Sequence, residues 1–109
     1  MRLKDWETKG IIKVIEDFFL DNNLLLNQVA LYLYGSRTDD KKRGGDIDLL
    51  LHVPSPIIIQ VKECKSQIHT KIKDVIGDQK IDILIVDKNS AKEPFSSIAL
   101  KNAVLIKSW

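Results

Sequence analysis

Two aspartates separated by a single residue, Asp46 and Asp48, open an apolar run. On a β-strand the side chains alternate between the two faces, so both carboxylates point to one side, while Ile47, Leu49 and Leu51 point to the other. At about 5–6 Å and an effective dielectric constant of about 20, two such charges repel by about 3 kcal/mol. A divalent cation between them would relieve this repulsion, and carboxylate oxygens are the ligands that Mg²⁺ prefers.

A glycine turn precedes this pair, because Gly35-Ser36-Arg37 follows an apolar run over residues 29–34. Glycine allows a tight turn and the close approach of a ligand to the backbone. Backbone N–H groups and a serine hydroxyl at such a turn suit phosphate groups, and arginine suits bidentate phosphate contacts. Since Mg²⁺ usually binds together with substrate phosphates, the turn and the carboxylate pair indicate phosphoryl or nucleotidyl transfer.

A third carboxylate, Asp82, lies within the apolar run 80–86, where it alternates with three isoleucines. The strand period of two puts Asp82 on the face opposite those isoleucines, where it could meet the first carboxylate pair. Two other motifs are excluded. The glycine and the glutamate of an EF-hand loop are missing, and no Gly-Lys-Ser/Thr follows the turn to make a P-loop.

Taken together, these residues resemble a known signature: Gly35-Ser36, nine residues, Asp46-x-Asp48, and Asp82 on a later strand. The pattern is similar to that of the DNA-polymerase-beta-like nucleotidyltransferases. It most resembles their smallest branch, the minimal nucleotidyltransferases (MNT) of bacteria and archaea. The resemblance extends over nearly the whole chain and implies the nucleotidyltransferase fold.

The resemblance also implies roles for these residues in a nucleotidyltransferase that uses ATP. The three carboxylates would be the catalytic residues and the ligands of two Mg²⁺ ions; these are Asp46, Asp48 and Asp82. The turn would bind the nucleotide triphosphate through Gly35, Ser36 and Arg37. One departure concerns Thr38-Asp39-Asp40, where the family usually has small or basic residues. These acids would oppose anion binding unless they turn towards the basic residues that follow them.

The acceptor is implied by the resemblance alone. MNT proteins are typically paired with a helical HEPN-domain toxin, so the resemblance implies an antitoxin that transfers AMP from ATP to the partner, on a tyrosine. We expect no separate acceptor domain, because the chain ends soon after its third carboxylate. The alternative is a non-catalytic antitoxin or regulatory subunit that neutralises its partner by binding alone. A glycosyltransferase with a DxD motif is disfavoured by the Gly-Ser turn.

Composition places the chain among ordinary globular proteins. It has 109 residues, 44% hydrophobic and 29% charged, which fits one domain over residues 1–109. The net charge of +2 is too small to indicate nucleic acid as a partner. A single Cys permits no internal disulfide. Neither a membrane span nor a signal peptide is recognisable, so we expect a cytoplasmic protein.

Hydrophobic periodicity predicts an α/β (α+β) fold in which helices pack against a small mixed sheet. The predicted elements are a helix over 5–21, a strand over 29–34, a turn or short helix over 36–42, a strand over 46–53, a helix from Pro56 to Gly77 with Ser55 as N-cap, a strand over 80–86, a helix over 94–101 and an edge strand over 104–106. The first helix should bury one face, made of Trp6, Ile11, Val14, Ile15, Phe18 and Phe19.

Several other residues have both an ordinary and a functional interpretation. Lys41, Lys42 and Arg43 are typical of a solvated loop, and Cys64 of a small core residue. His52 shares strand parity with the carboxylate pair and could border the site. Apolar residues near the C-terminus either fill the core or form part of a partner surface; these are Phe95, Ile98, Val104 and Ile106.

Overall fold

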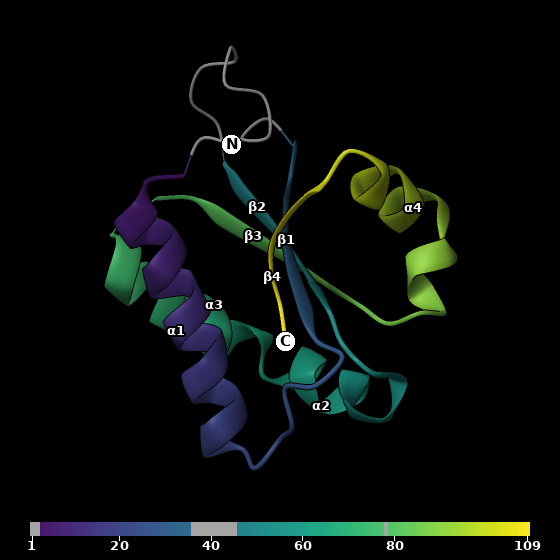
Figure 1. Cartoon of the computed structure of the whole chain (residues 1–109), viewed down its shortest axis with the longest axis horizontal. Helices are drawn as coiled ribbons and strands as arrows, with labels where there is room; N and C mark the ends of the chain where they lie inside the picture. The colour runs from purple at the N-terminus through teal and green to yellow at the C-terminus, as the bar shows by residue number, and fades with distance from the viewer. Residues whose placement is uncertain (1–2, 36–45, 78) are drawn as a thin grey trace.

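A computed structural model describes residues 3–35, 46–77 and 79–109. Within these ranges, helices and strands alternate as the hydrophobic periodicity predicts (Figure 1). In chain order the elements are α1 (Asp5–Asp21), β1 (Ala30–Tyr34), β2 (Ile47–His52), the 3₁₀ helix η2 (Ser55–Ile57), α2 (Ile58–Glu63), α3 (Lys65–Ile76), β3 (Ile81–Val86), the 3₁₀ helix η3 (Ser90–Lys92), α4 (Pro94–Lys101) and β4 (Val104–Ser108). The turn or short helix predicted over 36–42 lies outside the described residues.

The strands form a mixed four-stranded sheet in the order β3-β2-β1-β4. β1 is antiparallel to both β2 and β4, whereas β2 and β3 are parallel and are connected through α2 and α3. The last strand lies at the edge of the sheet, as predicted, and it runs two residues further than expected. The sheet therefore places β2, which carries the DxD motif, between β1 and β3.

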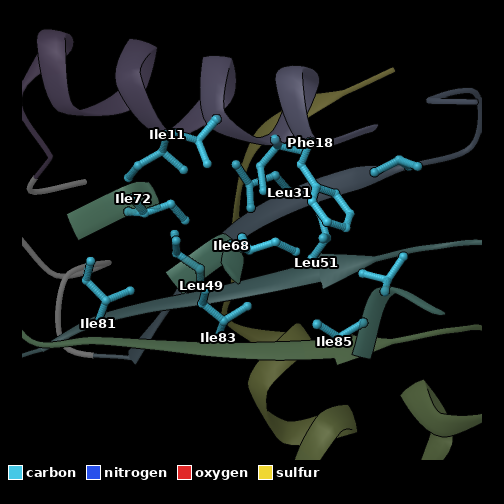
Figure 2. Close-up of a cluster of buried hydrophobic side chains, with 14 of the residues drawn as sticks. Ile11, Phe18, Leu31, Leu49, Leu51, Ile68, Ile72, Ile81, Ile83 and Ile85 are labelled. Atoms are coloured by element: carbon cyan, nitrogen blue, oxygen red, sulfur yellow. The ribbon is translucent and has the colours of Figure 1, made fainter. Parts of the chain in front are cut away.

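The main core fills the space between one face of the sheet and the helices α1 and α3 (Figure 2). The period of two sends alternate strand residues into it, including Leu49 and Leu51 of β2 and Ile83 of β3, which are nearly or fully buried. Phe18 and Ile11 of α1 and Ile68 of α3 meet them from the other side. Burial of these side chains supplies the largest stabilising contribution to the fold.

Helix α1 has the predicted bounds, but its buried face differs at the N-terminus. Trp6 is 53% exposed, and Glu7 is buried in its place. Trp6 precedes Ile11 by five residues, which rotates it about 140° away from the apolar stripe. Glu7 caps the helix by accepting a hydrogen bond from the Lys4 backbone N–H at 2.9 Å, and its other oxygen accepts one from Gln79 Nε2 at 2.6 Å. These bonds compensate for the burial of the carboxylate.

The single helix predicted from Pro56 to Gly77 is divided into three pieces. Ser55 is not an N-cap; it begins η2, and no side chain caps that helix. The chain breaks again at Cys64, whose backbone N–H bonds to Val61 three residues back. After the break the buried positions recur at Ile68, Ile72 and Ile76, which leaves Val75 47% exposed. Gly77 ends α3, as predicted, with a φ of 91° and a ψ of −170°, which differ from the left-handed helical conformation usual at this position.

The second face of the sheet is covered by a smaller cluster beneath α4. Its buried members are Tyr34, Leu50, Val86 and Ala99. The side of α4 that faces the sheet has small residues, while Phe95 and Ile98 are 65% and 68% exposed. Of the four C-terminal apolar residues singled out in the sequence, these two are exposed, and Val104 and Ile106 are partly buried.

Hydrogen bonds of Trp109 connect the end of β4 to the rest of the molecule. The backbone N–H of Trp109 donates to the Val29 carbonyl at 2.9 Å, and its indole N–H donates to Glu16 of α1 at 2.9 Å. Lys107 also contacts Glu16, with 3.3 Å between its Nζ and the carboxylate. The edge strand is therefore connected to both β1 and α1.

Among the described residues, no helix combines the length and the apolar character that crossing a membrane requires.

Candidate active site

Three side chains form a row across the second face of the sheet. Tyr34 of β1 lies opposite Asp48 of β2, and Asp48 lies opposite Asp82 of β3. Residues that pair directly across neighbouring strands point to the same face. The row therefore lies on the face opposite the main core, as the shared parity of the two aspartates predicts. Asp48 is partly buried and Asp82 is exposed, so the row opens to solvent on the β3 side.

Asp46 lies beside this row, immediately before β2 begins. It forms an ion pair with Lys80, which precedes β3, at 3.5 Å between Lys80 Nζ and the carboxylate. Both partners are substantially exposed, so this pair contributes little to stability. It does place a cation within the group of acidic side chains, where it offsets part of their mutual repulsion.

The surroundings of Asp48 disfavour its charged form. Burial is the largest cause that raises the pKa of its carboxyl, followed by the negative charges of Asp82 and Asp46. Lys80 acts in the opposite direction and lowers it. A cation bound to Asp48 would therefore neutralise a negative charge that the protein itself compensates only in part.

Tyr34 is a site residue that the sequence did not reveal. Burial, and then the charges of Asp82 and Asp48, raise the pKa of its phenol to about 12. The hydroxyl therefore stays protonated throughout the physiological range and remains a hydrogen-bond donor beside two carboxylates. In the sequence, only its position directly before Gly35 indicates that Tyr34 belongs to the site. This signal is weak, because it is the strand register that places Tyr34 opposite Asp48.

Gly35 fits the site for a steric reason. Its φ is +78°, in the left-handed region that favours glycine. A Cβ built on Gly35 would collide with Oδ2 of Asp48 and would lie 3.2 Å from its carboxyl carbon. The turn thus packs directly against the central carboxylate. Ser36 and Arg37, the other residues predicted to bind phosphates, lie outside the described residues, and so do Lys41, Lys42 and Arg43.

The residues around Asp48 suit a metal ion by the chemistry of their donors rather than by their arrangement. Across the described ranges, no group of three or more His, Cys, Asp or Glu side chains is arranged to hold a metal ion. The chemistry of the donors does suit a hard cation, because the carboxylates of Asp82 and Asp46 lie close enough to Asp48 for their charges to raise its pKa. The donor set thus fits Mg²⁺ in kind, with Asp46 paired to Lys80 in this arrangement.

Among the described residues, neither histidine contacts the three carboxylates. His52 is on the same face as Asp48 but ends β2, four residues further along. That spacing corresponds to about 13 Å along the strand. His69 of α3 contacts the carbonyl of Ile81 at 2.9 Å through Nε2. His52 therefore does not border the group of acidic side chains.

Comparisons with known proteins support the fold. The structure is similar to the crystal structure of a protein from Sulfolobus solfataricus that is provisionally assigned as a nucleotidyltransferase, with a TM-score of 0.52 and 17% sequence identity. The similarity covers 99% of this chain and 92% of that chain. The sequence matches no family model, and no curated protein matches it. At this identity the likeness concerns the fold: the chain has the small mixed α/β nucleotidyltransferase fold.

Proposed function

We propose that this chain is a magnesium-dependent nucleotidyltransferase that transfers AMP from ATP to a hydroxyl group. The observation that carries the proposal is the row of Asp48 and Asp82 on the open end of a sheet face, with Gly35 packed against Asp48. Asp46, beside this row, completes the set of three carboxylates. A nucleotidyltransferase fold with carboxylates at one sheet end suits this chemistry better than it suits a purely structural role.

In this proposal Asp46, Asp48 and Asp82 would hold Mg²⁺, which would supply positive charge for the triphosphate. Gly35 lets the backbone approach the phosphates, with Ser36 and Arg37 following it. The acceptor oxygen forms a bond to the α-phosphorus, the bond from that phosphorus to the bridging oxygen breaks, and pyrophosphate leaves. The acceptor proton passes to the carboxylate of Asp82, which is exposed to solvent and so accessible to an acceptor.

For the acceptor we propose a tyrosine hydroxyl of a helical HEPN-domain toxin, with this chain as its antitoxin. The family resemblance supports this partner. The exposed apolar side chains of Phe95 and Ile98 also support a protein partner, because α4 covers the same sheet face that carries the carboxylates. A partner bound there would lie next to the group of acidic side chains.

The second candidate is an antitoxin that neutralises its partner by binding alone. Two observations favour it. Asp46 is engaged by Lys80, and the described residues offer no group of three ligands arranged for a metal. In this case Phe95 and Ile98 would still bind the partner, and the carboxylates would be dispensable for neutralisation.

The deciding experiment is co-expression with the product of the neighbouring reading frame, followed by intact-mass measurement of that partner. Transfer predicts a mass gain of one or more AMP units with the wild-type chain. The gain should be lost for Asp82→Asn and kept for Asp74→Asn, a matched change of an exposed helix aspartate. A tight complex with an unmodified partner that Asp82→Asn neutralises equally well would support binding alone.

A further inference from the structure

A separate surface cavity lies at the end of the sheet away from the carboxylates. Its volume is about 290 Å³, and Gln28, His52, Ser55 and Lys88 are among the residues that line it. None of these residues belongs to the candidate active site. His52 ends β2, so the length of that strand separates the cavity from Asp48.

Three neighbouring strands bring the lining residues together. The register aligns Ala30 of β1, His52 of β2 and Val86 of β3 at this end of the sheet. Gln28 lies two residues before Ala30, ahead of β1, and Lys88 lies two residues after Val86, beyond the end of β3. Pro54 and Pro56 form part of the wall, and their fixed φ angles make that wall rigid. The cavity thus results from the sheet topology.

The lining is rich in hydrogen-bond donors and has no carboxylate among the described residues. Within that part of the chain, the side chains of Gln28, His52 and Lys88 have no hydrogen bond or ion pair. Their amide, imidazole and ammonium groups can all donate. Gln28 and Lys88 are exposed and His52 is half-buried, so their donor groups, one of them the charged ammonium of Lys88, are accessible to a ligand.

The nearest acidic group, Asp87, is already engaged. Its Oδ1 accepts hydrogen bonds from the backbone N–H groups of Asn89 and Ser90 at 3.1 and 2.8 Å, and from the Ser90 hydroxyl at 3.0 Å. The side chain of Asp87 is buried and does not line the cavity. The Ser55 hydroxyl is buried, so it is not exposed to a ligand in the cavity. The groups left for a ligand are those of Gln28, His52 and Lys88.

We propose that this cavity binds a small phosphate-class anion, at a site distinct from the carboxylates. A charged donor with two neutral or cationic donors around a partly enclosed space is the arrangement that holds a phosphate group. The volume is near the lower limit of ligand pockets, which suits phosphate or a short phosphate monoester. Binding there involves no transfer step and does not depend on the activity proposed above.

The test uses the whole chain in a buffer without Mg²⁺, titrated with inorganic phosphate, with glycerol phosphate, and with sodium chloride at matched ionic strength. The imidazole NMR signals of the two histidines report the location. His52 lies in the cavity, whereas His69 contacts the Ile81 carbonyl and serves as an internal control. We expect the His52 signal to shift with both phosphate ligands and not with chloride, while the His69 signal stays unchanged.

Two variants make the test selective. Lys88→Met removes the charged donor and should weaken phosphate binding at least about tenfold. Lys92→Met changes an exposed lysine outside the cavity and should leave the affinity unchanged. Tighter binding of glycerol phosphate than of phosphate would identify a monoester ligand, and the reverse would identify the free ion. Equal responses to phosphate and chloride, or an unchanged affinity in Lys88→Met, would overturn the proposal.

Discussion

The two faces of the sheet are made by the same strands but differ in how they are covered and in the side chains they carry. One face is fully covered by α1 and α3 and carries only apolar side chains from β2 and β3. The other is covered in its middle by α4, with carboxylates at one end and a donor-lined cavity at the other. The first face can therefore supply the stability that lets the second keep poorly compensated charges.

The largest expected effect comes from truncating the covered face. Leu49→Ala should lower the free energy of unfolding by about 2–5 kcal/mol, because it leaves a cavity in the main core. Leu84→Ala, on the partly buried second face, is the matched control and should cost clearly less. Urea unfolding measures both. Equal losses would show that the two faces contribute equally to the free energy of unfolding, contrary to this prediction.

The next effect concerns the turn that meets the open face. Both Gly35 and Gly77 have a positive φ, but only at Gly35 would a Cβ collide with a neighbour, Asp48. Gly77→Ala should cost about 1–3 kcal/mol from backbone strain alone, because its φ of 91° and ψ of −170° lie in a region that is essentially restricted to glycine. Gly35→Ala should cost about 1 kcal/mol or more beyond its own backbone strain, since the Asp48 carboxylate must also move. Thermal melting of both variants tests this difference.

A double-mutant cycle identifies the cause. The loss in Gly35→Ala should shrink towards that of Gly77→Ala when Asp48 is replaced by Gly, because the colliding carboxylate is gone. An unchanged loss in that background would mean that Gly35 is required for its backbone conformation only.

The third effect concerns Asp87, at the end of β3 on the cavity side. Backbone and hydroxyl donors lower the pKa of its carboxyl from 3.8 to about 2, with Ser90 the main cause. A lowered folded-state pKa means that Asp87 stabilises the protein above about pH 4 and that this contribution fades between about pH 4 and 2. Asp87→Asn should therefore lower the melting temperature at pH 7 and converge with wild type near pH 2.

The smallest expected effect is a gain in stability, whereas the preceding substitutions should all lower it. The pKa of Asp48 is raised, so the folded state disfavours its charged carboxylate. The resulting loss of stability grows as the pH rises above the ordinary pKa of an aspartate. Asp48→Asn should stabilise the protein at pH 7 by less than about 1 kcal/mol, because the group is partly exposed and solvent screens it. The gain should disappear in acid. Melting curves at pH 7 and pH 3 measure it, with Asp74→Asn as the control.

Added Mg²⁺ sharpens this last measurement. If Asp48 is a ligand, the ion should raise the melting temperature of wild type and have less effect on Asp48→Asn, because binding to the native state alone stabilises it. Identical responses of the two proteins would rule out Asp48 as a ligand. The response of Asp74→Asn should match that of wild type.

Local sequence pattern was sufficient for the four strands, for the first and last helices and for the two sheet faces. The alternation around Ile47, Leu49 and Leu51, and that of the isoleucines of β3, separated the core face from the face of Asp48 and Asp82. Helix α1 and helix α4 have the predicted bounds. These features depend on backbone periodicity, which neighbouring residues in the chain encode directly.

What only the tertiary structure decided involves partners distant in sequence. The strand register brought Tyr34 level with Asp48 and Asp82, and no pattern within β1 specifies that register. Glu7 is buried because Gln79, 72 residues away, donates a hydrogen bond to it. The break at Cys64 and the donor-lined cavity likewise arise where separate elements meet. Side-chain periodicity follows from local backbone geometry, whereas register and compensated burial depend on contacts that exist only once the chain has folded.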